Sequence, residues 1–342
     1  MENQRIFIEN LQPGLVVDQI FCVREKELRT TKAGGLFISM KLGDKTGEIS
    51  AKVWQATEPL FESIPLDGFI QVKGRVEDYR GILQLVAEAF RPWSADHVNL
   101  ADFLPVSPYD IEDMWSEMLE HLREVKNRHL RRLIKKFLED SKFVTAYKAS
   151  PAAVSMHQPY MGGLLEHSLN MVRACKKLLP LYPHLNADLV ITAAFLHDSA
   201  KSAELTSGLG IHSTAPGLLL GHITLACMWV EEKARKVEEE MGEPFPKKIT
   251  MLLQHIILSH HGQYDYGSPK LPAVPEAFFL HYIDNLDAKM WMTRNIIESD
   301  LDPSSQFTNY SRPLETRIFK HSEHLEGDPP IKPAEHADQQ NP

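Results

Sequence analysis

The sequence predicts a multidomain protein in which an all-β barrel is followed by an all-α domain. Its 342 residues exceed the length of one typical domain. Hydrophobic residues alternate with period two in the first part of the chain, whereas from Tyr109 onward they recur with the helical period of about 3.6 residues. We expect the barrel at 1–95, a linker at 96–108, the helical domain at 109–325 and a disordered tail at 326–342.

The first domain has the pattern of five strands and one short helix. Leu36, Ile38 and Met40 alternate with their neighbours as in a half-buried strand, and Gly43-Asp44-Lys45-Thr46-Gly47 supplies a turn. Five strands with one inserted helix fit a small Greek-key barrel of the OB type. The expected strands are 16–23, 36–42, 49–53, 69–76 and 82–89, and the expected helix is 58–63.

Amphipathic helices fill the second domain. Ile111, Trp115 and Met118 recur at helical spacing, and the same spacing returns at Leu130 and Leu133. The end of the chain is rich in Pro, Gln and acidic residues, which is typical of a disordered segment. Further helices are expected at 164–179, 187–201, 221–241, 249–261 and 277–297.

Composition favours a cytoplasmic protein. The three cysteines, Cys22, Cys175 and Cys227, form no CxxC pair, which argues against a disulfide framework and against zinc-thiolate sites. No apolar stretch approaches the length of a membrane span, so no membrane partner is expected. The net charge of −9 mildly disfavours a nucleic-acid partner, although bound divalent cations would add positive charge locally.

Histidines concentrate in the helical domain. Ten of the sixteen lie between 157 and 281, little more than a third of the chain. The apolar run LVITAAFLHDSAK ends with adjacent His197 and Asp198, and a buried carboxylate costs several kcal/mol unless it is paired or coordinated. A metal ion is therefore expected there. Further nitrogen and oxygen donors lie on separate helices, at His167, His222, His260, His261 and Asp284.

The order of these donors resembles the H…HD…D pattern of the HD-domain phosphohydrolases and of their dinuclear variants. The resemblance implies two divalent ions. One is expected on His167, His197, Asp198 and Asp284. The second is expected on Asp198, His222, His260 and His261, so that Asp198 bridges the pair. A donor set of this kind suits Mn²⁺, Mg²⁺, Fe²⁺, Co²⁺ or Zn²⁺, and manganese is our first expectation.

Three phrases behind the barrel narrow the resemblance. GGLLEHS, LSHHGQYDYGSP and LHYIDNLDAK look like the YhaM-type 3′–5′ exoribonucleases. That family joins an OB-fold to an HD domain, and the resemblance implies degradation of single-stranded RNA, and for some members DNA, from the 3′ end. One departure is visible: the common HD-Ile-Gly-Lys phrase reads His197-Asp198-Ser199-Ala200-Lys201 here. Lys201 is kept, and its ammonium is expected to neutralise charge on the phosphate beside the catalytic Asp198.

The barrel is expected to bind the nucleic acid. Aromatic and cationic residues alternate with the core-facing residues of its strands, as in proteins that bind single strands by stacking and charge. His157 precedes Gln158-Pro159-Tyr160 and resembles a position near the family's site. The expected partners are single-stranded RNA and also single-stranded DNA, and a homo-oligomer stays open. The candidate barrel residues are Phe37, Lys41, Lys52, Trp54, Lys73, Arg75 and Tyr79.

Other functions stay open at this point. The chain could be a phosphohydrolase of nucleotides or of a cyclic dinucleotide, but the GYP phrase of the HD-GYP enzymes is missing after His261, and a small substrate would not need the barrel. It could also be a non-catalytic single-strand-binding protein, which the complete donor set disfavours. The basic run 128–136 fits either a solvated helix face or a nucleic-acid contact.

Overall fold

The computed structural model describes residues 5–31, 34–79, 81–99, 102–103, 106–154, 158–206, 211–300 and 305–320. His157 and the predicted tail at 326–342 lie outside these residues. The chain divides into two compact units between Asp287 and Ala288. The first unit contains the barrel and most of the helices.

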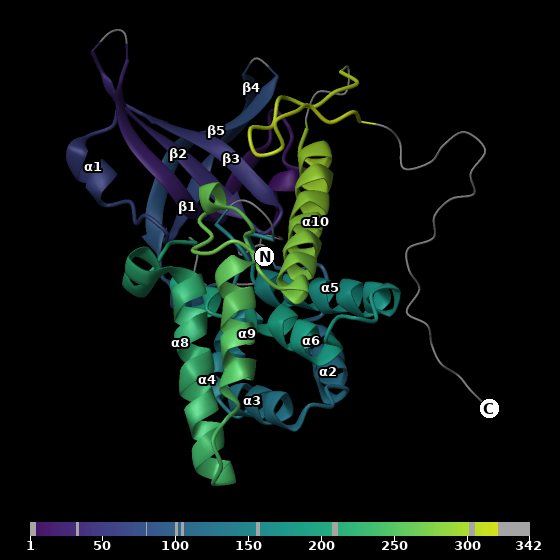
Figure 1. The fold of residues 1–342 in the computed structure, drawn as a ribbon. Helices are drawn as coiled ribbons and strands as arrows, with labels where there is room; N and C mark the ends of the chain where they lie inside the picture. Colours follow the sequence, from purple (N-terminus) through teal and green to yellow (C-terminus); the bar gives the residue numbers. More distant parts are fainter. Residues whose placement is uncertain are drawn as a thin grey trace, which may run out of the picture. The chain divides into compact units, whose positions relative to one another are not determined.

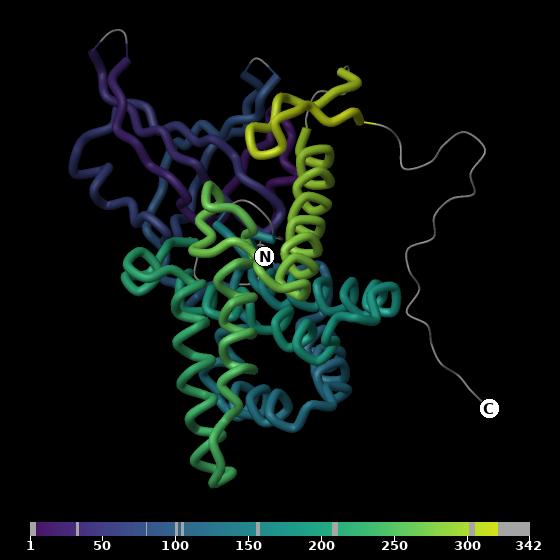
Figure 2. The backbone as a smooth tube through the Cα atoms, viewed as in Figure 1, coloured from purple at the N-terminus to yellow at the C-terminus, as the bar shows by residue number. Residues whose placement is uncertain are grey.

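The N-terminal strands close into a barrel in the order β1-β2-β3-β5-β4. Neighbouring strands are antiparallel except β3 and β5, which run parallel. Figure 1 labels these strands, and Figure 2 traces their path. Helix α1 (Glu58–Glu62) lies between β3 and β4, so the predicted OB-type barrel is confirmed. The strands are β1 (Val16–Thr30), β2 (Leu36–Asp44), β3 (Gly47–Trp54), β4 (Phe69–Tyr79) and β5 (Ile82–Trp93).

Alternate strand residues fill the barrel. Ile38 and Met40 of β2 are buried, whereas Phe37 and Lys41 beside them are only partly buried. Strand β1 runs to Thr30 and does not end at the predicted position. Its backbone keeps pairing with β2 after the burial of alternate side chains has weakened, so the hydrophobic pattern alone underestimates its length.

Side-chain caps begin many helices of the second domain. Asp110, Asn127 and Asp140 accept backbone N–H groups at the starts of α2, α3 and α4, and such caps typically contribute about 1 kcal/mol each. The all-helical prediction for this region is confirmed. The helices are α2 (Ile111–Arg123), α3 (Arg128–Leu138), α4 (Ser141–Ala149), α5 (Gly163–Leu178), α6 (Ala187–Leu196), α7 (Lys201–Glu204), α8 (Ala215–Met241), α9 (Lys247–Ser259) and α10 (Pro275–Glu298).

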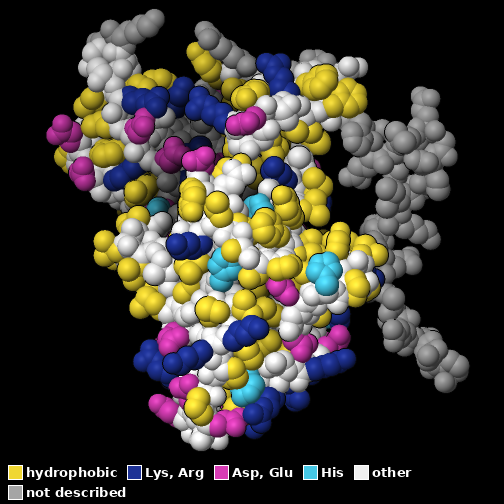
Figure 3. Space-filling model, in the orientation of Figure 1, with side chains coloured by type: hydrophobic (Ala, Val, Ile, Leu, Met, Phe, Trp, Pro, Cys, Tyr) yellow, Lys and Arg dark blue, Asp and Glu magenta, His cyan; other side chains and the backbone are white. Residues whose placement is uncertain are grey.

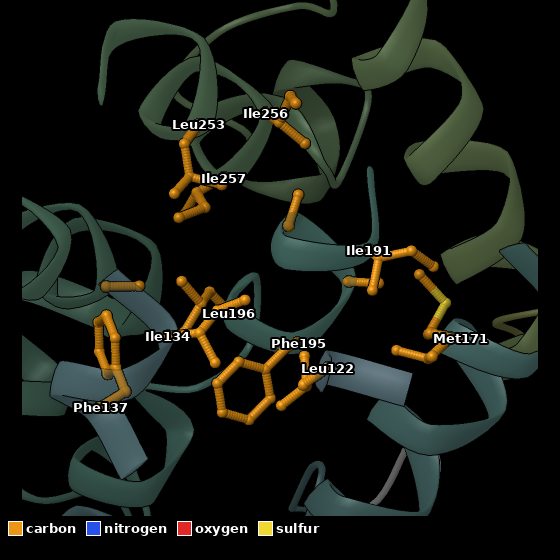
Figure 4. Close-up of a cluster of buried hydrophobic side chains, with 14 of the residues drawn as sticks. Leu122, Ile134, Phe137, Met171, Ile191, Phe195, Leu196, Leu253, Ile256 and Ile257 are labelled. Carbon is orange, nitrogen blue, oxygen red and sulfur yellow. The ribbon is translucent and has the colours of Figure 1, made fainter. Parts of the chain in front are cut away.

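Helix α6 lies at the centre of the helical domain. Every residue from Leu189 to Leu196 is buried, as expected for a helix that is apolar all round. Figure 4 shows Phe195 and Leu196 of α6 close to Phe137 of α3 within a cluster that includes residues of α9. The apolar centre fixes the carboxyl end of α6, which the candidate ligands His197 and Asp198 follow directly.

Two breaks in helices differ from the prediction. The predicted helix at 187–201 is wrong in its last turn: α6 ends at Leu196, the next four residues form turns, and α7 begins at Lys201. Helix α8 begins before the predicted residue and is kinked at Gly221, whose φ of 72° and ψ of 156° are not helical. Both breaks lie beside candidate metal ligands. Polar side chains there form hydrogen bonds with backbone groups that would be satisfied within a regular helix.

The basic run on α3 is largely engaged in ion pairs. Arg132 and Lys136 both pair with Glu240 of α8, and Arg128 lies 2.8 Å from Glu243. These contacts join α3 to the end of α8 and favour the reading as a solvated helix face. Cationic and acidic side chains are also interspersed on the face shown in Figure 3.

The second unit starts within α10 and continues through residues 305–320. Short bridges pair Phe307 with Phe319 and Ser311 with Thr316. Across the described parts of both units, no helix combines the length and the apolar character that crossing a membrane requires.

Candidate metal centre

Seven side chains from five stretches of the helical domain converge in its interior. His167 lies in the first turns of α5, the His197-Asp198 pair follows α6, and His222 follows the kink of α8. His167 and His197 are wholly buried, and Asp198 is 1% exposed. On the face drawn in Figure 3, histidines reach the surface only as separate patches. The remaining members come from the end of α9 and from α10: His260, His261 and Asp284.

The donors form two groups. His167, His197 and Asp284 offer ligand atoms within 4.8 Å of one another, and so do the three histidines of the other group. Oδ1 of Asp284 lies 3.2 Å from Nε2 of His167 and 4.0 Å from Nε2 of His197. The second group consists of His222, His260 and His261.

Asp198 lies between the two groups, and each of its oxygens faces one of them. Oδ2 is 3.6 Å from Nε2 of His167 and 3.4 Å from Nε2 of His197. Oδ1 is 3.3 Å from Nε2 of His222 and 3.4 Å from Nε2 of His260. A carboxylate in this position can bridge two cations.

Backbone and carboxylate acceptors orient all five rings with Nε2 toward the interior. Nδ1 of His197, His260 and His261 lies 2.7–2.9 Å from a carbonyl oxygen. Nδ1 of His167 and of His222 instead faces a carboxylate. All these partners only accept hydrogen bonds, so Nδ1 carries the proton and Nε2 of a neutral ring keeps its lone pair. Neutral imidazole in this tautomer is the form that binds a metal.

The centre contains buried polar atoms that no hydrogen bond satisfies. Oδ1 of Asp198, Nε2 of His222 and Nε2 of His260 are buried, and none has a hydrogen-bond partner in the described chain. Each would cost roughly 1–3 kcal/mol if it stayed unsatisfied. The two ring nitrogens lie 3.3 Å and 3.4 Å from the Asp198 oxygen. Acceptor atoms at that separation without an intervening proton fit a shared cation.

Burial keeps two rings of the second histidine group neutral, whereas acidic neighbours outweigh burial and raise the pKa of the third, His222. Burial and the neighbouring His260 lower the pKa of His261 to about 3, and burial likewise lowers the pKa of His260. Burial opposes charging of His167, but Asp284 and Asp287 outweigh it and raise its pKa to about 10. A cation bound at Nε2 of His167 would replace that proton, because ligands must be deprotonated to bind a metal.

Lys201 brings a cationic side chain to this cluster. Its side chain is almost fully buried, and Nζ donates to Oδ2 of Asp198 at 2.7 Å. Burial alone would raise the pKa of Asp198, but Lys201 and His197 hold it well below its usual value. The carboxylate is therefore ionised. The structure places Lys201 beside Asp198, and its contact with a substrate phosphate stays a prediction.

Gly262 and His281 support the turn that follows α9. His281 donates Nδ1–H to the carbonyl of His260 at 2.7 Å, so it holds the backbone of a candidate ligand. Gly262 has a φ of +77°, and a Cβ there would lie 2.2 Å from the His281 ring. Only glycine allows this close packing at the end of the helix.

Two carboxylates contact ligand histidines at Nδ1, the ring nitrogen that faces away from the centre. Asp287 lies 2.7 Å from Nδ1 of His167, and Glu204 lies 2.8 Å from Nδ1 of His222. Asp287 stands three residues after Asp284, about one helical turn, so this spacing can be read from the sequence. Sequence reasoning missed Glu204. Its spacing from His222 has no periodic signal, because the contact depends on the break at Gly221.

Four of the seven candidate residues on the barrel lie close together. Phe37 pairs with Trp54 across β2 and β3, with ring centroids 5.1 Å apart. Lys52 lies 5.7 Å from the Trp54 ring and 5.1 Å from the Tyr79 ring. Trp54 and Tyr79 are about half exposed, as stacking requires.

The other three barrel candidates lie apart from this group. Lys73 and Arg75 are exposed on β4. Lys41 is 3.2 Å from Glu25 and 3.3 Å from Glu48, so two carboxylates already offset its charge. This ion-pairing makes Lys41 the weakest of the seven.

Comparisons with known proteins agree with both domains. The HD domain model matches residues 164–289, and a model described as an OB-fold nucleic acid binding domain matches residues 23–93. The first match spans all seven donors. Divalent-metal dependence follows from the HD domain, while the comparison does not choose the ion.

Several curated relatives align with almost the whole chain. The 3′-5′ exoribonuclease YhaM of Shouchella clausii (strain KSM-K16) is 36% identical over 313 residues, covering 91% of this chain and 95% of that protein. That of Geobacillus sp. (strain WCH70) is 35% identical over 314 residues, 91% and 94% of the two chains. That of Bacillus subtilis (strain 168) is 34% identical over 307 residues, 90% and 95%. With this identity over nearly the full length of both partners, the chain belongs to the YhaM exoribonuclease family.

Proposed function

We propose that the chain is a metal-dependent 3′–5′ exoribonuclease that releases nucleoside 5′-monophosphates from single-stranded RNA. Its relatives are named 3′-5′ exoribonucleases, and the chain aligns with them over about nine tenths of its length. The observation that carries the proposal is the position of Asp198, whose two oxygens face two histidine groups. That arrangement suits phosphodiester hydrolysis, in which charge develops on phosphate oxygens.

Two divalent ions are the proposed cofactors, and manganese is the proposed metal. His167, His197, Asp198 and Asp284 would hold one ion, and Asp198 with the three other histidines would hold the second. When bound, such a pair supplies Lewis acidity that neutralises phosphate charge and activates the attacking water. The donors contain no thiolate, so they fit hard and borderline divalent cations.

The chain's own residues position the substrate and offset its charge. Lys201 is held beside Asp198 at 2.7 Å and can turn its ammonium toward a phosphate oxygen. Removing a positioned group that stabilises developing charge typically lowers kcat by about 10²–10³. The deep burial of His167, His197 and His260 excludes bulk water from that side of the centre.

The barrel is the proposed site for the single strand. Phe37, Trp54 and Tyr79 offer rings for stacking, each worth about 1–3 kcal/mol per base, and Lys52 adds charge between two of them. Lys52 offers a positive charge on an otherwise acidic chain, so we expect RNA binding to weaken as the salt concentration rises.

A labelled substrate tests this function. Purified protein is incubated with Mn²⁺ and single-stranded RNA labelled at its 5′ end, and the products are separated by length. A descending ladder that keeps the label, together with nucleoside 5′-monophosphates, is the expected result. The same experiment with single-stranded DNA tests the second polymer.

Two outcomes would redirect the assignment. An intact oligonucleotide together with hydrolysed cyclic dinucleotide would favour a small-molecule phosphodiesterase. Binding of RNA without any product would favour a non-catalytic protein. The Asp198→Asn variant, prepared in parallel, controls for a contaminating nuclease.

A further inference from the structure

The five candidate ligand histidines differ in the group that accepts a hydrogen bond from Nδ1 of the ring. Three donate Nδ1–H to backbone carbonyls, at Ala194, Ile257 and Tyr266. The other two face carboxylates, Glu204 and Asp287. Each group of donors contains one histidine whose Nδ1 faces a carboxylate. Each of the two proposed ion positions therefore has one such histidine.

Glu204 makes two contacts with the same ligand. Its Oε2 lies 2.8 Å from Nδ1 of His222, and its Oε1 accepts the backbone N–H of His222 at 3.1 Å. The backbone contact matters because the non-helical Gly221 leaves the next N–H at the start of a helical segment, without an intrahelical acceptor. Glu204 therefore caps that segment and orients the ring it presents.

Tight packing fixes the position of Glu204 itself. Gly217 lies against its backbone so closely that a Cβ on Gly217 would be 2.5 Å from the Glu204 carbonyl oxygen. Burial would raise the pKa of Glu204, but the contact with His222 lowers it below its usual value. A carboxylate held in place from both sides can fix the direction of the His222 ring.

Asp287 has the same relation to His167. Its Oδ2 lies 2.7 Å from Nδ1 of the fully buried ring, and Gln158 donates its side-chain amide to the same oxygen at 3.4 Å. Asp287 stands on α10 one turn beyond Asp284, the carboxylate that faces Nε2 of that ring. The two aspartates thus approach opposite nitrogens of one imidazole.

We infer that Glu204 and Asp287 are positioning residues that set the affinity of the two ions separately, Glu204 acting through His222 and Asp287 through His167. A carboxylate behind a metal-bound histidine fixes its tautomer and increases its basicity more than a carbonyl does. This inference rests on the proposed metal centre. It adds that each ion has its own supporting carboxylate, so the two ions respond to different substitutions.

Titration with Mn²⁺ tests this independently of RNA hydrolysis. Wild-type protein stripped of metal is compared by isothermal titration calorimetry with Asp287→Asn and Glu204→Gln, which keep the size of each side chain. Each variant is expected to keep one ion at wild-type affinity and to bind the other about 10- to 100-fold more weakly. His167→Ala and His222→Ala identify the ions: Asp287→Asn should weaken the same ion as His167→Ala, and Glu204→Gln the same ion as His222→Ala.

The controls separate positioning from general stability. Asp265→Asn removes an exposed carboxylate from the loop after the ligands, and it should leave both affinities unchanged. A Glu204→Asp variant keeps the charge with a shorter reach and should recover part of the affinity that Glu204→Gln loses. Thermal unfolding of the metal-free variants shows whether each one folds.

Three results are distinguishable. If wild type binds two ions and both variants match it, the inference is wrong while the metal centre stands. If both ions weaken equally in either variant, the carboxylates support the whole centre, and the separate assignment is wrong. If wild type binds no Mn²⁺, the proposed centre itself fails.

Discussion

Lys201 donates to one oxygen of Asp198 at 2.7 Å, while the other oxygen of the same carboxylate has no hydrogen-bond donor within the described structure. The bonded oxygen faces His167 and His197, and the unsatisfied oxygen faces His222 and His260. One side chain thus connects the candidate charge-stabilising lysine to both groups of donors.

Replacing Lys201 should slow hydrolysis without preventing metal binding. Lys201→Gln removes the ammonium but keeps a donor of similar length, so we expect kcat to fall about 10²-fold or more. Steady-state kinetics on single-stranded RNA, with the Mn²⁺ content measured in parallel, checks this. A kcat within twofold of wild type would exclude a role for Lys201 in the reaction.

Asp198→Asn should abolish hydrolysis while the fold survives. An amide of the same shape can still accept from Lys201, but it cannot supply a negative oxygen to each donor group. Circular dichroism and thermal unfolding report the fold, and RNA degradation in Mn²⁺ reports activity. Retention of more than a few per cent of the manganese-dependent activity would refute the site assignment.

Removing metal should lower both activity and stability. Without cations, the unsatisfied atoms of Asp198, His222 and His260 stay buried, and ligand binding stabilises a fold by about 4 kcal/mol at a thousandfold excess over Kd. Dialysis against a chelator should therefore abolish hydrolysis and lower the Tm, and added Mn²⁺ should restore both. An unchanged Tm after verified metal removal would contradict the expectation that bound ions stabilise the fold.

The barrel group should govern RNA affinity. Lys52→Ala combined with Trp54→Ala removes a charge and a ring that lie 5.7 Å apart, and stacking alone is worth about 1–3 kcal/mol. We expect binding to weaken about tenfold or more in a filter-binding titration with the inactive Asp198→Asn background. Lys41→Ala is the matched control, because Lys41 is already paired with two acids. Equal affinities for the double variant and wild type would exclude this surface.

A pH-dependent stability difference is expected at Asp140. Its pKa is lowered, chiefly by the hydrogen bond from Lys233 at 2.6 Å. A lowered pKa means that the ionised form stabilises the fold above the unfolded value of 3.8 and that this stability is lost as the pH falls through the folded value. Asp140→Asn keeps the helix cap but loses the charge.

Thermal unfolding at several pH values measures this effect. The side chain of Asp140 is 38% exposed, so we discount the charged hydrogen bond to about 1 kcal/mol. The variant should have a lower Tm than wild type, by a constant amount between pH 5 and pH 8, and the gap should close below about pH 4. A gap that grows on acidification would have the wrong sign.

The sequence predicts the ligands of the centre better than their support. His197 and Asp198 are identifiable because polar, chargeable residues follow an apolar run. The periodicity of the hydrophobic residues gives the OB-type strands and most of the helices. The pattern does not show that α6 stops at Leu196, because residues 197–201 remain compatible with a helix. Glu204 is invisible for a related reason: its partner lies eighteen residues away, and their contact exists only because the backbone departs from helical geometry at Gly221.

Gly221 carries a practical warning for anyone who engineers this chain for heat resistance. Glycine inside a long helix is an obvious target for alanine, a change that gains about 1 kcal/mol where the backbone is helical. Here the φ of 72° would place an alanine in a strained conformation, and relaxing it would straighten α8 and rotate the imidazole that follows. Helix regularity and catalytic geometry are opposed at this one position, so a more regular α8 would be gained at the expense of the enzyme.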